Sequence, residues 1–252
     1  MPVEPILAVR ALSKRYEGLL ALSGVDFEIQ PGEIFGVIGP NGAGKTTLFA
    51  CLSGSIPPTS GTVVFRGRRI DGLPSHAVVA LGLVRTHQIV RPFREMTVEE
   101  NVLIGARFGT GRRRGAEAAR RTREVLERTS LAPRARVPAR ALTIGELKRL
   151  EIARALAAEP AVLCLDEVMG GLNPSEINAA MELIRDIRAG GVTVLMIEHH
   201  VHAVVGVSDR IMVLDFGQKI AEGPPQKVLD DPAVITAYLG NAAGILPPAA
   251  AG

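Results

Sequence analysis

The sequence predicts an α/β fold built on a parallel central sheet, and three observations support this prediction. Short apolar runs alternate with helical segments along much of the chain, which is typical of a parallel sheet covered by helices. The earliest runs are separated only by turns, so they predict a small antiparallel layer added to the edge of that sheet. From about Thr97 to Ala158 the pattern turns helical, which predicts a helical segment interrupting the core.

The elements of the first part of the chain are delimited by turn residues. Glu17 and Gly18 separate two runs that alternate as strands do, and Pro31 and Gly32 make the next turn. A short apolar run that ends in Gly39 is consistent with a buried strand. In chain order, this part predicts strands in ILAVRALSKRY, ALSGVDFEIQ, IFGVIG and GTVVFRGRRI, with a helix in KTTLFACLSG before the last of them.

The second part predicts further helices and strands. The stretch EAARRTREVLERTSL consists of helix formers without internal glycine or proline. A later helix in SEINAAMELIRDIRAG has Ser175 as its expected cap and Gly190 as its expected stop. Strands are predicted in AVLCLDE, VTVLMIEHH and RIMVLDFGQKIAEG.

Composition excludes several classes of protein. The 252 residues are 47% hydrophobic and 22% charged, as in an ordinary globular protein. No apolar run is long enough to span a bilayer, and the N-terminus shows no secretory signal. Cys51 and Cys164 lie in apolar stretches and are interpreted as small core residues rather than a disulfide or a metal site. These features indicate a cytosolic protein.

We expect one domain over residues 1–240. Its core would comprise residues 1–90 and 160–240, and residues 91–159 would form the helical subdomain. Residues 241–252, with low-complexity sequence, are expected to form a flexible tail.

A glycine-rich loop carries the strongest functional signal. GPNGAGKTT, residues 39–47, fits the P-loop (Walker A) pattern G-x-x-x-x-G-K-[ST] between a predicted strand and a predicted helix. Its glycines let backbone N–H groups turn toward phosphate oxygens, and the helix N-terminus adds partial positive charge. Lys45 can reach the β- and γ-phosphates, and the Thr46 hydroxyl is placed to ligate Mg²⁺. The loop therefore predicts a nucleoside triphosphate site formed by Asn41, Gly42, Ala43, Gly44, Lys45, Thr46 and Thr47.

Two carboxylates are predicted to complete this site. Asp166 and Glu167 emerge at the C-terminal end of a buried strand, where ligand sites of such sheets lie. Asp166 would hold Mg²⁺, directly or through water, and Glu167 would polarise the attacking water. The alternative is a pair of solvated acids at a strand end.

The order of these motifs resembles that of ABC transporter ATPase subunits. The phosphate loop, Gln88, LTIGELKRLEIARAL, Asp166–Glu167, GLNPSE and MIEHH follow one another as in that family, over about Leu7 to Gly240. GLVRTHQIVRPFREMTVEENVLIGA and IAEGPPQKVLDDPAVITAYLG look like the ATP-binding subunits of branched-chain amino acid importers. The resemblance implies an ABC-type P-loop NTPase core, with a small antiparallel β layer and an inserted helical subdomain. It also implies ATP as the nucleotide and Mg²⁺ as the cofactor.

The resemblance also implies roles for single residues. Gln88 would sense Mg²⁺ and contact the membrane partner, and Tyr16 would stack on adenine. His199 would contact the γ-phosphate and steady the water near Glu167. The alternatives are a tyrosine that packs in its strand and a neutral histidine that closes one. The pair His199–His200 leaves the histidine assignment open by one position.

The signature motif departs from the family pattern. Where the family usually has Leu-Ser-x-Gly-Gln, closing over ATP held by the opposite subunit, this chain has Thr143 for the serine and Glu146 for the glutamine. Thr143 keeps a hydroxyl for the γ-phosphate, and Gly145 keeps the close backbone approach. Glu146, expected to begin the helix, favours the helix dipole but brings negative charge nearer the phosphates. We expect weaker binding rather than none, since one hydrogen bond contributes about 0.5–1.5 kcal/mol.

Four other positions depart from the common pattern. His87 precedes Gln88 where phenylalanine is common, and Val168 replaces the proline after the catalytic glutamate. Asn173 stands in the loop that crosses the dimer interface, where many family members carry aspartate. His200 replaces a common aspartate. These changes affect the expected rate rather than the reaction.

The sequence thus predicts the ATPase subunit of an ABC importer, peripheral to the cytoplasmic face of the inner membrane. It would pair with a second ATPase subunit, as a homo- or heterodimer, act on membrane permease subunits, and serve a solute-binding protein indirectly. A similar exporter ATPase, such as that of lipopolysaccharide transport, is the close alternative. A soluble nucleic-acid or ribosome-associated ABC ATPase is disfavoured by the single phosphate loop and the lack of a heptad run, so no nucleic-acid partner is expected.

Positive charge is concentrated in the helical segment. Between Arg107 and Arg140 there are 11 arginines and three acids, a balance of +8 against +3 for the whole chain. One interpretation is a solvated helical face. The other is a surface near anionic lipid headgroups or a membrane partner.

Overall fold

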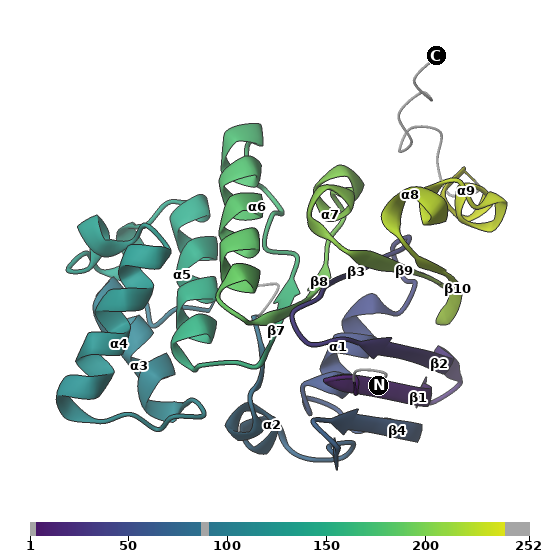
Figure 1. Ribbon diagram of the computed structural model, residues 1–252, viewed down its shortest axis with the longest axis horizontal. Helices are drawn as coiled ribbons and strands as arrows, with labels where there is room; N and C mark the ends of the chain where they lie inside the picture. The colour runs from purple at the N-terminus through teal and green to yellow at the C-terminus, as the bar shows by residue number, and fades with distance from the viewer. Residues whose placement is uncertain (1–3, 87–90, 240–252) are drawn as a thin grey trace.

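The computed structural model describes residues 4–86 and 91–239 (Figure 1). His87, Gln88 and the expected tail over residues 241–252 lie outside the described residues. No helix within the described ranges is long and apolar enough to cross a bilayer.

A six-stranded sheet forms the centre of the molecule. Its strands lie in the order β10–β9–β3–β8–β7–β6, and all neighbours are parallel except β10 on β9. The residues of β3, β7 and β8 are all buried, as expected for parallel strands covered on both faces. The predicted parallel sheet is therefore confirmed. Its strands are β3 (Ile34–Ile38), β6 (Leu83–Arg85), β7 (Val162–Asp166), β8 (Thr193–Ile197), β9 (Arg210–Asp215) and β10 (Gln218–Gly223).

The antiparallel layer forms a separate sheet, so the prediction that it adds to the edge of the central sheet was wrong. The order β2–β1–β4–β5 contains β1 (Leu7–Tyr16), β2 (Leu19–Ile29), β4 (Ser60–Phe65) and β5 (Arg68–Arg69). Leu48 and Phe49 of helix α1 (Lys45–Leu52) share one hydrophobic core with residues of both sheets. The layer is separate because its apolar face is buried against α1 and the central sheet.

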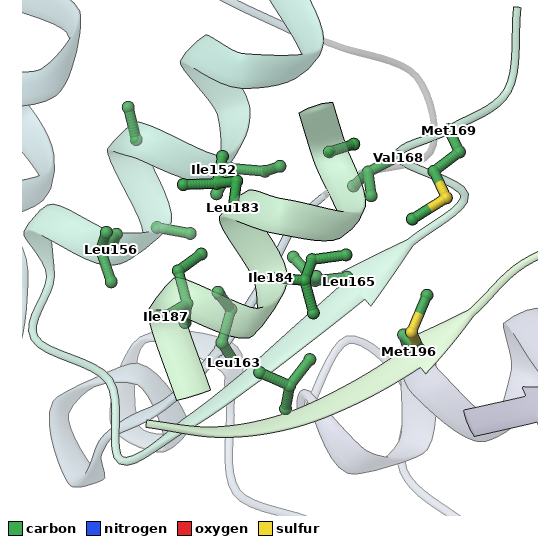
Figure 2. Close-up of a cluster of buried hydrophobic side chains, with 14 of the residues drawn as sticks. Ile152, Leu156, Leu163, Leu165, Val168, Met169, Leu183, Ile184, Ile187 and Met196 are labelled. Carbon is green, nitrogen blue, oxygen red and sulfur yellow. The ribbon is translucent and has the colours of Figure 1, made fainter. Parts of the chain in front are cut away.

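Helices cover the other face of the central sheet. Figure 2 shows Leu183, Ile184 and Ile187 of α6 (Pro174–Ala189) beside Leu163 and Leu165 of β7. This second core also includes residues of α5 (Ile144–Ala157) and α7 (Val201–Val207). The short helices α2 (Ser75–Leu81), α8 (Pro225–Leu229) and α9 (Pro232–Leu239) complete the fold. Cys51 and Cys164 are buried and free, as predicted for core residues.

Among the described residues between β6 and β7, three α-helices form the helical segment. Helices α3 (Val98–Phe108) and α4 (Gly115–Arg128) pack on each other, and both pack on α5 (Figure 1). Two short 3-10 turns, Ala132–Arg134 and Ala139–Ala141, lead from α4 into α5. Since α5 also joins the core over the central sheet, it connects the two parts of the molecule.

Many arginines of the 107–140 stretch form ion pairs within the chain. Their partners lie in α4 itself, in α5 and α6, before α3 and after α5, which favours a solvated and internally paired surface. The pairs include Arg113–Glu159, Arg120–Glu124, Arg128–Asp186, Arg134–Glu146 and Arg140–Glu95.

Candidate nucleotide-binding site

The phosphate loop joins the end of β3 to the start of α1. Gly42 and Gly44 have φ angles of 80° and 98°, in the region that favours glycine. A Cβ atom on Gly44 would lie 2.5 Å from the Ala21 carbonyl oxygen. Glycine is therefore required at this position both by backbone conformation and by the close approach of β2.

Lys45 begins α1 and is directed into the loop. Its ammonium donates hydrogen bonds to the carbonyl oxygens of Gly39, at 2.7 Å, and Pro40, at 2.9 Å. Burial lowers the pKa of Lys45, and the nearby carboxylates of Glu167 and Asp166 oppose that shift. Because both bonded acceptors are neutral, the positive charge can attract the phosphates of a nucleotide.

A cavity of about 460 Å³ opens over this loop. Glu167 and His199, from the ends of different strands, line it together with the loop, and Tyr16 lines it from β1. The cavity thus brings together Tyr16, Asn41, Gly42, Ala43, Gly44, Lys45, Thr46, Thr47, Glu167 and His199, all named from the sequence. Leu19, Leu20, Ala21 and Phe216, which the motifs did not indicate, also line it.

Glu167 and His199 contact each other beside the phosphate loop. His199 Nε2 lies 2.7 Å from Glu167 Oε1. Glu167 has a φ of 49°, and its carbonyl oxygen accepts a hydrogen bond from the Lys148 ammonium at 2.8 Å. His200 is the residue before α7 and does not line the cavity. The geometry therefore favours His199 over His200 as the histidine of this site.

Asp166 is fully buried at the end of β7. Its Oδ2 accepts hydrogen bonds from the Arg85 guanidinium at 2.5 and 3.2 Å. Its Oδ1 is buried and has no hydrogen-bond partner among the described residues. A buried carboxylate oxygen without a partner is costly unless a cation or water satisfies it, so Asp166 fits the chemistry of a Mg²⁺ ligand. Arg85 was not foreseen, because its contact joins strands far apart in the sequence.

Glu198 is a second buried acid, to which the sequence analysis assigned no role. It follows β8, is 1% exposed, and accepts the Met169 N–H at 2.8 Å. Burial raises its pKa to about 7, and the Met169 N–H and Lys148 oppose that shift. Glu198 therefore holds the segment that follows Glu167. In the sequence, the only indication that Glu198 is buried was its position at the end of a fully apolar strand.

The altered signature forms the N-terminus of α5. Thr143 is the N-cap, and its hydroxyl accepts the Glu146 N–H at 3.2 Å. In return, the Thr143 N–H donates a hydrogen bond to the Glu146 carboxylate at 2.9 Å, which completes a capping box. The helix therefore begins at Ile144 rather than at Glu146, because Thr143 supplies the cap. The Thr143 hydroxyl keeps its own proton for a further acceptor.

The charge of Glu146 is paired within the chain. Its Oε1 lies 2.7 Å from Nε of Arg134, at the end of the first 3-10 turn. Burial alone would raise the pKa of Glu146, but the hydrogen bonds from Arg134 and Thr143 outweigh it and lower the pKa. The added negative charge at the signature thus has its counter-charge close by.

The N-terminus of α6 lies beside the signature. A Cβ atom on Gly145 would lie 2.4 Å from the Glu176 carboxylate, so α5 and α6 approach closely there. Asn173, not Ser175, caps α6, and the Ser175 hydroxyl donates to the Asn173 side chain instead. The prediction of Ser175 was wrong because either residue can cap, and Pro174 at the first helical position fixes the earlier start. Thr143, Gly145, Glu146 and Asn173 do not line the phosphate-loop cavity.

Comparison with known proteins identifies the class. Residues 22–170 match the family described as ABC transporter. Residues 218–244 match the family described as branched-chain amino acid ATP-binding cassette transporter. The chain belongs to the ABC transporter ATP-binding family, whose members are ATPases that power transport.

Three relatives place it more closely. It is 44% identical over 253 residues to the high-affinity branched-chain amino acid transport ATP-binding protein LivG of Escherichia coli K12, covering 95% of this chain and 99% of LivG. It is 35% identical over 236 residues to the lipopolysaccharide export system ATP-binding protein LptB of Acidithiobacillus ferridurans, covering 94% and 97%. The crystal structure of the ADP conformation of MJ1267, an ATP-binding cassette of an ABC transporter, matches with a TM-score of 0.86 and 31% identity, covering 95% of this chain and all of that one.

Proposed function

We propose that this chain is the ATP-hydrolysing subunit of an ABC importer for branched-chain amino acids or similar small polar solutes. The observation that carries the reaction is the cavity in which Lys45, Glu167 and His199 meet over the phosphate loop. The importer assignment is supported by the match of residues 218–244 and by the similarity to LivG.

The phosphate loop and the two carboxylates would bind and activate ATP. Backbone N–H groups of the loop and Lys45 would hold the β- and γ-phosphates. Thr46, Asp166 and Gln88 would hold Mg²⁺, which, when bound, neutralises charge on the phosphate oxygens. The free Oδ1 of Asp166 supports this placement.

Hydrolysis would use the contact between Glu167 and His199. Glu167 would orient and polarise the attacking water, and His199, 2.7 Å from its carboxylate, would hold that carboxylate and meet the γ-phosphate. This chemistry needs positioning more than covalent steps, since the transferred phosphoryl group carries most of the developing charge.

A second ATPase subunit would close the site. Thr143, Gly145 and Glu146, with Asn173 beside them, would face the ATP held by the opposite subunit. Support comes from their position outside the phosphate-loop cavity and from the exposed helix N-terminus of α5, which favours an anion. The pair would be a homodimer or a heterodimer with a similar subunit.

The helical subdomain, residues 91–159, would contact the membrane permease subunits. A groove of about 170 Å³ lies between this subdomain and the end of β6, lined by residues that include Val84, Arg85 and Ile104. The subunit would thus sit peripherally at the cytoplasmic face of the membrane, and a solute-binding protein would deliver the transported molecule to the permeases.

Two experiments test ATP hydrolysis and the identity of the transported solute separately. The purified chain should release phosphate from Mg-ATP. The Glu167→Gln variant should lose most of this phosphate release while it still binds ATP. Co-expressed with candidate permeases, the wild type should support uptake of labelled leucine, and Glu167→Gln should not.

The lipopolysaccharide-export alternative rests on the similarity to LptB. GLNPSE and IEHH favour the importer. Rescue of lipopolysaccharide export rather than leucine uptake in cells that lack the matching ATPase would overturn the importer assignment.

A further inference from the structure

We propose that Phe216 is a nucleobase-binding residue, which stacks on adenine in the cavity that Tyr16 also lines. This proposal rests on the proposed ATP-binding function and adds a residue to that site. Phe216 lies at the turn between β9 and β10, more than 150 residues from the phosphate loop in sequence, and belongs to none of the motifs.

The first observation is the chemistry of the cavity wall. One part of the wall is the phosphate loop, and the rest includes the apolar residues Tyr16, Leu19, Leu20 and Phe216. Phe216 is 78% exposed and Tyr16 is 42% exposed. The cavity therefore combines a polar phosphate loop with exposed aromatic side chains. This combination suits a ligand that has an anionic end and a flat π-system.

The second observation is that the turn is fixed to the phosphate loop. The Gly217 N–H donates to the Ala43 carbonyl at 3.0 Å, and the Gly217 carbonyl accepts the Ser23 N–H at 2.8 Å. A Cβ atom on Gly217 would lie 2.7 Å from the Ala21 carbonyl oxygen. The backbone beside Phe216 is therefore held at a set position relative to the residues that would bind phosphate.

The third observation is the backbone conformation of Phe216. Its φ is 42°, a left-handed value that is unfavourable for a bulky residue and that glycine or asparagine adopts more easily. Phe216 does not belong to either hydrophobic core, so burial of its ring does not offset this backbone strain. A strained, exposed phenylalanine at a cavity points to a role in binding rather than in folding.

Stacking would act on the base alone. Every nucleobase has a π-face, so an aromatic contact adds affinity for the base with little preference between adenine and guanine. Inorganic tripolyphosphate carries the anionic part of ATP without the base. The two ligands therefore distinguish a base contact from an effect on the phosphate loop.

The test compares Phe216 variants of the full chain by calorimetric titration. Phe216→Ala should weaken binding of ATP and GTP by about 5- to 20-fold and leave binding of tripolyphosphate unchanged. Phe216→Trp should retain ATP affinity. Phe216→Asn should weaken ATP binding while keeping or raising the melting temperature, because Asn-Gly is a favoured pair in such hairpin turns.

Arg66→Ala is the matched control. Arg66 is also an exposed residue with a left-handed φ, 51°, followed by glycine in a hairpin turn, but it lies away from the cavity. The Arg66→Ala variant should bind ATP as the wild type does. Equal loss of ATP and tripolyphosphate binding in Phe216→Ala, or no loss of either, would overturn the proposal. A wild-type chain that bound tripolyphosphate but not ATP would instead contradict the proposed function.

Discussion

The phosphate-loop half and the signature half of the molecule differ in how completely one chain builds them. Around the phosphate loop, Lys45, Glu167 and His199 from three separate elements already share one cavity, and the glutamate and histidine are in contact. The signature half consists of the capped N-termini of α5 and α6, which lie side by side but face no phosphate loop of their own chain. On the proposed function, one copy of the chain would thus supply most of the groups for hydrolysis at its own phosphate loop, and its separate signature surface would bind the phosphates of ATP held by another subunit.

This difference leads us to expect that the signature half tolerates substitution better than the catalytic half. The catalytic half depends on groups from separate strands meeting at the carboxyl ends of a parallel sheet, so each group has a fixed position. The signature half depends mainly on a helix N-terminus and on close backbone approach. Thr143 and Glu146 preserve both, because their capping box keeps the helix end and Arg134 pairs the added charge.

The largest expected effect lies in the catalytic half. We expect His199→Ala to lower the rate of ATP hydrolysis by about 10²–10³-fold, because Glu167 loses the partner that orients it. His200→Ala, a change of the same size one residue on, should stay within about threefold of the wild type. Steady-state phosphate release at saturating Mg-ATP measures both. A larger loss in His200→Ala would assign the role to the other histidine.

A second effect concerns Glu198, the buried acid that holds the segment after Glu167. The pKa of Glu198 is about 7 in the folded chain, against 4.5 for the free group, because it is buried. The folded state therefore holds the proton more tightly, and the free energy of unfolding falls as pH rises from about 4.5 to 7. Glu198→Gln keeps an oxygen for the Met169 N–H and removes this penalty.

Glu198→Gln should thus be more stable than the wild type at pH 8, by on the order of 1–3 kcal/mol, and closer to it at pH 5. Denaturant unfolding at the two pH values gives the comparison. A stability difference that does not change with pH would show that burial of the charge is not the cause.

The smallest expected effect tests the charge pairing in the signature half. Arg134→Met leaves Glu146 unpaired near the helix end, and should raise the ATP concentration for half-maximal hydrolysis by about two- to tenfold. Glu146→Gln should remove most of that penalty in the double variant. Arg136→Met, an exposed arginine two residues away, serves as the control. Additive effects of the two signature changes would contradict the pairing.

The sequence predicted features that depend on local pattern and missed those that depend on distant contacts. The phosphate loop was recognisable because spacing, strand and helix are contiguous. Arg85 on Asp166 and the Met169 N–H on Glu198 join segments that only the folded sheet brings together. Nothing in the sequence indicated that Phe216 lines the cavity. It reaches the cavity because the pairing of β9 and β10 places their hairpin turn there.

The local sequence pattern also left open the cap of α6 and the place of the antiparallel layer, both of which the structure decides. Asn173 and Ser175 are both good caps, and the position of Pro174 selects the first of them. Strand alternation predicted the antiparallel layer but not its place, which follows from burial of its apolar face against α1.

In the proposed function, one chain holds a catalytic half that a second subunit completes. Its most direct test is the mass of the Glu167→Gln variant by light scattering, with and without Mg-ATP, since removing the general base should trap the closed pair. We expect a monomer without nucleotide and a dimer with Mg-ATP, and we expect dimer formation to be lost when Gly145 is also changed to a bulky residue. A variant that binds ATP and stays monomeric, even when it is mixed with a candidate partner ATPase subunit, would contradict this proposal.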